Sequence, residues 1–196
     1  MIRAVRQLAG DRSGVGVVEF ALVLPVLLIA LMGMLDLGYN MYTVTLLQGA
    51  IQAAARSSTL ENAAANTAAI DALVSTAVKD IAPGATLTFK RTSYPSFSST
   101  NKPEDFTDTN GNGRCDAGEP FEDVNENGVW DTDQGTSGSG GSRDVVVYLV
   151  TVTYPRQFAI ASLLGGSNMF TMKAQTVLAN QPWDNVQKSP PVRNCK

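Results

Sequence analysis

The feature that most constrains this chain is an apolar run close to its first residue. Val15 to Leu35 comprises 21 residues, of which Glu19 is the only charged one. A helix of this length is about 30 Å long, which matches the hydrocarbon core of a lipid bilayer. The run therefore predicts a membrane-spanning helix. Because lipid penalises a carboxylate, Glu19 is predicted to have a function.

The charges around the run predict its orientation. Arg3, Arg6 and Arg12 precede it, against one acidic residue, Asp11. Basic residues that flank a span tend to stay on the cytoplasmic side. We therefore expect a single-pass protein with a cytoplasmic N-terminus and with everything after Asp36 on the far side of the membrane.

A cleaved secretory signal peptide is the competing interpretation. The apolar run is longer than a usual signal core, and no small-x-small cleavage site follows it. Apolar residues instead continue at alternating steps of three and four, which is the period of a helix. We predict a transmembrane and extended helix over residues 15–57, about 60 Å long from Val17 to Ser57. The apolar residues that continue the period are Leu35, Tyr39, Tyr42, Leu46, Ala50 and Ala53.

The residues around Glu19 resemble the class III signal of type IV pilin-like proteins. The string GVGVVEF covers residues 14–20, with basic residues before it and an apolar helix after it. In that class a prepilin peptidase cuts after the glycine and leaves a glutamate at the fifth mature position. The resemblance implies a leader over residues 1–14, cleaved between Gly14 and Val15.

A longer segment resembles the TadE-like family of pseudopilins from tight-adherence (Flp) pilus systems. It reads VEFALVLPVLLIALMGMLDLGYNMYTVTLLQGAIQAAARSS. The family pattern has an EFAL-x-LP start, an acid-Gly-aromatic step and a Q-x-A-x-x-A-A-R end. Here these parts are Glu19 to Pro25, Asp36 to Tyr39 and Gln48 to Arg56. The departure is Asp36-Leu37-Gly38, where a glutamate or aspartate followed directly by an aromatic residue is commoner in the family.

The resemblance implies a structural, non-enzymatic role for the apolar helix in the bacterial inner membrane. Glu19 would pair with the terminal amine of a neighbouring subunit, so that two groups which lipid penalises singly neutralise each other and set the subunit register. Phe20 and Pro25 would belong to the same assembly contact. The implied partners are the prepilin peptidase, the major pilin and other pseudopilins. The alternative is that Glu19 lies at the edge of the span and extends toward water.

A second amphipathic helix is expected after the first. Ser58 and Glu61 have the spacing of a capping box, and Pro83 with Gly84 would end the helix. Between them, apolar residues recur at helical spacing. They are Ile70, Leu73, Val74, Ala77, Val78 and Ile81.

Three later segments have the composition and alternation of strands: Thr86 to Lys90, Asp144 to Tyr154, and Phe170 to Leu178. Gln157 to Leu164 is predicted to be a short helix-like connection that packs on the sheet or touches the membrane surface. An extracytoplasmic domain over residues 58–196 is the result. We predict an α+β, pilin-like fold in which the helices pack on an antiparallel sheet of about three strands.

Acidic residues concentrate in an insertion at about residues 104–134. Glu104 to Asp133 contains ten acids and one basic residue, Arg114, which gives that window a net charge of −9. The overall charge of −3 is therefore an average over very different regions and indicates nothing about binding partners. We expect neither nucleic acid nor a small-molecule substrate as a partner. A Gly/Ser linker over 135–142 follows the insertion and is predicted to be flexible.

Within the insertion, DTNGNGRCDAGE over residues 108–119 fits the twelve-residue calcium loop. Oxygen ligands at alternate positions surround one hard cation, a glycine at position 6 permits the turn, and a glutamate at position 12 can bind through both oxygens. This pattern predicts one bound Ca²⁺. The predicted ligands are Asp108, Asn110, Asn112, the backbone carbonyl of Arg114, Asp116 and Glu119.

A second, weaker calcium loop begins fifteen residues later. Asp123, Asn125, Asn127 and Asp131 repeat the first nine positions, but Gln134 occupies position 12, so Glu122 or Asp133 would have to complete the site. The prolines on both sides of the first loop argue against the flanking helices of a calcium sensor. Calcium would act structurally, and an acidic solvated loop that binds nothing is the alternative.

Composition removes the commonest general base. The chain has no histidine, which excludes histidine-based catalysis and histidine-dependent zinc sites. Its two cysteines, Cys115 and Cys195, would be free to pair in an oxidising compartment, and the sequence leaves that pairing open. The leading hypothesis is a minor pseudopilin for assembly or initiation of a Flp pilus. The alternative is a membrane-anchored calcium-dependent binding or adhesion module outside any pilus.

Overall fold

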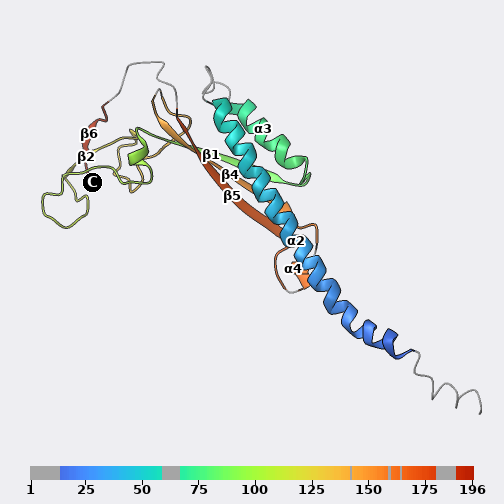
Figure 1. The fold of residues 1–196 in the computed structure, drawn as a ribbon. Helices are drawn as coiled ribbons and strands as arrows, with labels where there is room; N and C mark the ends of the chain where they lie inside the picture. Colours follow the sequence, from blue (N-terminus) through green and yellow to red (C-terminus); the bar gives the residue numbers. More distant parts are fainter. Residues whose placement is uncertain (1–13, 59–66, 142, 159, 164, 180–188) are drawn as a thin grey trace, which may run out of the picture. The chain divides into compact units, whose positions relative to one another are not determined.

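A computed structural model describes residues 14–58, 67–141, 143–158, 160–163, 165–179 and 189–196. The leader predicted over residues 1–14 lies outside this part except for Gly14, and so does Glu61 of the predicted capping box. Figure 1 shows the helices and strands along the chain. In chain order they are α2 (Val15–Ser58), α3 (Thr67–Lys79), β1 (Thr86–Tyr94), η2 (Phe97–Ser99), β2 (Pro120–Glu122), β3 (Thr136–Ser137), β4 (Val145–Pro155), α4 (Ile160–Leu163), β5 (Met169–Ala179) and β6 (Val192–Asn194).

The chain divides into two compact units. The first contains Met1–Tyr42 and Pro155–Phe170, and the second contains Thr43–Tyr154 and Thr171–Lys196. The first unit holds the N-terminal part of α2, where most apolar side chains are exposed, together with α4. Within the described residues, α2 is the one helix that is long and apolar enough to cross a membrane. The predicted long N-terminal apolar helix is therefore confirmed, and it runs through Pro25.

The second unit is built on a four-stranded antiparallel sheet in the order β3-β1-β4-β5. β1 and β4 pair over their whole common length, from Thr86 opposite Thr153 to Tyr94 opposite Val145. Side chains alternate between the two faces of a strand. Every second residue of β4 is accordingly buried, and alternate residues of β5 are buried or half-buried, with Met172 and Leu178 buried. The buried residues of β4 are Val146, Tyr148, Val150, Val152 and Tyr154.

Helix α3 is linked to this sheet by a partly buried polar cluster. Arg91 of β1 donates to both carboxylate oxygens of Asp71 at 3.0 and 2.6 Å, and the Tyr148 hydroxyl of β4 donates to Asp71 Oδ1 at 2.5 Å. Burial raises the pKa of Tyr148, and its hydrogen bond to Asp71 raises it further, so the phenol stays protonated. The apolar side of the core is completed by Ile70, Val74 and Val78 of α3 and by Leu47, Ile51 and Ala54 of α2.

Two strand pairings were not predicted, so the expected count of about three strands is wrong. β3 lies inside the predicted Gly/Ser linker and pairs with β1, with Ser137 opposite Thr92. β2 and β6 form a separate two-stranded sheet that joins the insertion to the C-terminal end of the chain. Both were missed because short strands of two or three residues carry no periodic pattern of their own.

Candidate functional site

The N-terminal end of α2 carries the residues predicted for cleavage and assembly. Gly14 precedes the helix, and Val15 is its first residue. Glu19 is exposed, and among the described residues no hydrogen bond or ion pair reaches its carboxylate. Phe20 is 58 % exposed, and Pro25 is also exposed. An exposed acid on an exposed apolar helix is arranged for contacts outside this chain.

The first loop of the insertion, residues 108–119, is organised by hydrogen bonds to its own acidic side chains. Asp108 accepts N–H groups from Gly111 at 2.6 Å and from Gly113 at 2.7 Å. Glu119, at position 12, accepts the Thr109 N–H through Oε1 at 2.8 Å and the Asp116 N–H through Oε2 at 2.9 Å. The side chain of Glu119 thus joins positions 2 and 9 of the loop.

These hydrogen bonds stabilise the charged forms of the acids. The Gly113 N–H is the main cause of a lowered pKa at Asp108, and the Asp116 N–H is the main cause at Glu119. At Asp116 the pKa is lowered by the amides of Asn110 and Asn112, which donate to Oδ2 at 2.7 and 2.6 Å. The first loop is therefore held as a set of ionised carboxylates.

The second loop, residues 123–134, repeats most of these hydrogen bonds at the same positions up to position 9. Asp123 accepts the Asn127 N–H at 3.0 Å and the Gly128 N–H at 2.8 Å. Asp131 Oδ2 accepts the amide nitrogens of Asn125 and Asn127 at 2.7 and 2.6 Å, just as Asp116 does in the first loop. The loops differ in which residue supplies the closing glutamate.

In the second loop the role of the position-12 glutamate falls to Glu104, which sequence reasoning missed. Glu104 accepts the Val124 N–H at 2.8 Å and the Asp131 N–H at 3.0 Å, which are positions 2 and 9 of that loop. Its side chain is almost fully buried, and burial raises its pKa. The two residues proposed from sequence to complete the loop lie elsewhere. Glu122 is exposed on β2, and Asp133 contacts the Tyr94 hydroxyl at 3.2 Å.

A signal for Glu104 exists in the sequence as a fifteen-residue repeat. Glu104 precedes Asp108 by four residues, and Glu119 precedes Asp123 by four. The two segments also meet in space, since Phe106 and Phe121 form an antiparallel bridge. Aligning the two repeats places Glu104 and Glu119 at equivalent positions. Because Glu119 closes the first loop, this alignment makes Glu104 the candidate to close the second loop.

At the centre of each loop, asparagine side chains direct their amide nitrogens at an aspartate carboxylate. Asn110 and Asn112 direct Nδ2 at Asp116, and Asn125 and Asn127 direct Nδ2 at Asp131. Among the described residues no group of three or more Asp, Glu or Cys side chains is arranged to hold a metal ion. A cation in either loop would therefore need these amides to turn their oxygens inward, since only the oxygen can bind it. The Arg114 N–H donates to Asn112 Oδ1 at 2.8 Å.

Residues at the C-terminal end of the chain bond to both loops, through a disulfide to the first and an ion pair to the second. Cys195 forms a disulfide with Cys115 of the first loop, so the pairing that sequence left open is present, and the Cα atoms are 5.8 Å apart. Arg193 Nε lies 2.5 Å from Oδ2 of the fully buried Asp123. In the part of the chain described here, this is the one ion pair that neutralises an acid of the insertion.

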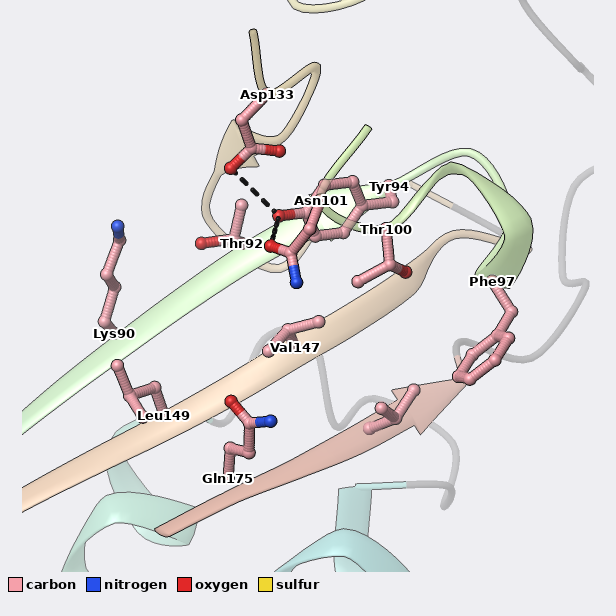
Figure 2. A pocket seen from close by; sticks show the side chains of 11 residues that line it. Lys90, Thr92, Tyr94, Phe97, Thr100, Asn101, Asp133, Val147, Leu149 and Gln175 are labelled. Carbon is pink, nitrogen blue, oxygen red and sulfur yellow. Dashed lines mark hydrogen bonds between the residues drawn. The ribbon is translucent and has the colours of Figure 1, made fainter. Parts of the chain in front are cut away.

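A pocket opens on the sheet beside the insertion (Figure 2). Tyr94 stands at its end, with its hydroxyl 3.2 Å from Asp133 Oδ2 and 3.4 Å from Asn101 Oδ1. Burial and the neighbouring Asp133 raise the pKa of Tyr94, so it remains a neutral donor. The remaining lining is Lys90, Thr92, Phe97, Thr100, Val147, Leu149, Gln175 and Val177, which includes no paired nucleophile and base.

Comparison with known proteins bears on the N-terminal segment. Residues 14–56 match the family model described as TadE-like protein, which is a pseudopilin family of Tad pilus assembly. No curated protein and no solved structure matched the chain. Members of the matched family are structural rather than enzymatic proteins, and the family implies association with the Tad pilus machinery. The apolar helix suggests a single membrane anchor, and the disulfide suggests an extracytoplasmic domain. The chain is therefore similar to the TadE-like family over residues 14–56.

Proposed function

We propose that this chain is a minor pseudopilin that takes part in assembly or initiation of a tight-adherence (Flp) pilus. It would be a single-pass protein of the bacterial inner membrane, with a cytoplasmic leader removed by the prepilin peptidase and its α+β domain outside the cytoplasm. The family match at residues 14–56 is the observation that carries this proposal. The exposed apolar surface of α2, from Val15 to Leu37, is suited to lipid before assembly and to neighbouring helices after it.

Glu19 gives the proposed assembly its register. Cleavage after Gly14 would create a new amine at Val15, four residues before Glu19. An amine and a carboxylate from neighbouring subunits would each remove the other's penalty in lipid. The exposed position of Glu19, without a described partner in its own chain, leaves it open to such a contact. The neighbours would be the major pilin and the other pseudopilins.

The test is cleavage and piliation in cells that carry the whole pilus system. Mass spectrometry of the purified protein is expected to show a chain that begins at Val15. Glu19→Ala should leave membrane insertion intact and abolish most pili, whereas Val18→Ala, an exposed neighbour, should leave piliation unchanged. Normal piliation in Glu19→Ala would remove Glu19 from assembly. An uncleaved chain that is absent from the pilus machinery would favour the alternative, a membrane-anchored calcium-dependent binding or adhesion module.

We further propose that the insertion binds Ca²⁺, with one ion in the first loop and a second ion in the second loop. The oxygen-bearing side chains at positions 1, 3, 5 and 9 and a glutamate for each loop support this assignment. Glu104 and Glu119 are buried carboxylates without an ion pair among the described residues, and burying negative charge is costly unless a cation compensates it. Each bound ion would supply that compensation once the asparagine amides turn their oxygens toward it.

Calcium is proposed to have a structural role, because ion binding to a site that forms only in the folded chain stabilises the fold. An ion present at 100 times its Kd stabilises the folded state by about 2.7 kcal/mol. Chelation is therefore expected to lower the melting temperature of the full chain, and added Ca²⁺ should restore it. Equal melting temperatures with and without a chelator would remove the ion from this proposal.

A further inference from the structure

The apolar part of α2 carries two acids, and they differ in their surroundings. Glu19 and Asp36 are 17 residues apart, which is about 25 Å along a helix. Both therefore fall within about one bilayer thickness of each other. Glu19 is exposed, whereas the Asp36 side chain is only 12 % exposed. A terminal amine from a neighbouring subunit would in principle be attracted to either acid.

Asp36 is already neutralised within its own chain. The Arg156 guanidinium forms an ion pair with Asp36 Oδ2, and Asn40 Nδ2 donates to the same oxygen at 3.1 Å. Arg156 follows β4 directly and belongs to the same compact unit as Asp36. Charge pairing here removes the attraction that Asp36 would exert on any other cation.

Arg156 is itself held in place by its surroundings. Its backbone N–H donates to the Asn168 carbonyl at 2.7 Å, and its guanidinium lies over the Phe170 ring, 5.1 Å from the ring centre. The cation therefore approaches Asp36 from a fixed segment of backbone. Asp36 Oδ1 is buried without a hydrogen-bond partner, so Asp36 keeps an unused acceptor that would strengthen its pull on a foreign amine if Arg156 were lost.

We propose that Arg156 is a specificity-determining residue for assembly register. By neutralising Asp36 within the chain, it leaves Glu19 as the one acid of the apolar helix open to a neighbouring amine. An amine that paired with Asp36 instead would displace its subunit by about 25 Å along the helix. This inference rests on the proposed pairing of Glu19 with an amine, and it assigns the choice between the two acids to Arg156.

The experiment measures which acid a neighbouring N-terminus approaches. A photo-crosslinking amino acid replaces Leu22, next to Glu19, or Leu37, next to Asp36, and both positions are exposed on the helix. Full-length protein is irradiated in cells with the complete pilus system, and captured N-terminal peptides of neighbours are identified by mass spectrometry. The readout is the capture at position 37 relative to position 22.

Four variants separate specificity from a general loss of structure. Arg156→Gln should raise the capture ratio about tenfold, which corresponds to about 1.4 kcal/mol. Asp36→Asn breaks the same ion pair but creates no competing acid, so its ratio should equal that of the unmodified chain. Arg156→Gln combined with Asp36→Asn should return to that value. Arg156→Lys, which keeps the charge, should also retain it.

Each outcome decides between named alternatives. An unchanged ratio in Arg156→Gln would overturn the proposal, and so would a raised ratio in Asp36→Asn, because that would indicate structural damage from losing the pair. Failure of the Glu19 proposal appears differently, as the absence of neighbouring N-terminal peptides at position 22 in the unmodified chain. Formation of the Cys115–Cys195 disulfide in every variant controls for folding.

Discussion

The two loops of the insertion have nearly the same internal hydrogen bonds but obtain their closing glutamate in different ways. The first loop uses Glu119, its own twelfth residue, whereas the second uses Glu104, which comes earlier in the chain than either loop. Glu104 therefore precedes the first loop in the chain but closes the second, whereas Glu119 precedes the second loop but closes the first. The pair forms one structure, because the second loop is not complete as a separate sequence segment.

The loops also differ in how their negative charge is compensated. Asp123 of the second loop is fully buried and paired with Arg193. Asp108 of the first loop is half-buried, and its charge is stabilised by backbone N–H groups alone among the contacts described. Glu104 is buried and has a raised pKa, while the pKa of Glu119 is lowered by its hydrogen bonds. The second loop consequently depends more on the surrounding structure, and the first on its own backbone.

The largest expected effect comes from replacing either closing glutamate, Glu104 or Glu119, in the presence of Ca²⁺. Glu119→Gln and Glu104→Gln should each remove about half of the calcium-induced rise in melting temperature, because each disables one site. The double variant should lose the whole rise. Isothermal calorimetry should find two ions bound to the unmodified chain and one to each single variant.

Glu122→Gln is the matched control for that experiment. It makes the same change of charge on an exposed side chain of β2, between the two loops, and should keep both ions. If Glu122→Gln behaved like Glu104→Gln, then overall charge and not a completed loop would explain the loss. Two ions bound to Glu104→Gln would end the assignment of that residue to the second loop.

The sequence predicted those parts of the fold that have a repeating pattern. The apolar period of α2, the spacing of Ile70, Val74 and Val78 in α3, and the alternation in β4 all come from residues close together in the chain. β3 was missed because Thr136 and Ser137 lie among glycines and serines, which look like a linker. β6 was missed because its three residues become a strand only through pairing with β2, about 70 residues earlier.

The candidate sites divide in the same way. The residues of each loop were predicted from a local twelve-residue pattern, and Glu19 was predicted from the short string at residues 14–20. Glu104 and Arg193 act on a loop from outside it, and Arg156 meets Asp36 across 120 residues of sequence. Local spacing in a single sequence cannot predict these contacts, because the fold of the chain decides which distant charged residues become neighbours.

The smallest expected effect is on stability without calcium, when the Asp123–Arg193 ion pair of the second loop is broken. Asp123→Asn should lower the free energy of unfolding by about 1–3 kcal/mol, because a buried acceptor of charged hydrogen bonds is weakened. Arg193→Gln should cost about 1 kcal/mol or less, since Arg193 is 48 % exposed and water compensates for part of the loss. Asp105→Asn, at an exposed acid of the same insertion, should change stability little. Urea unfolding in chelator measures all three, and an equal effect of Asp123→Asn and Asp105→Asn would mean that the second loop does not rely on its buried charge.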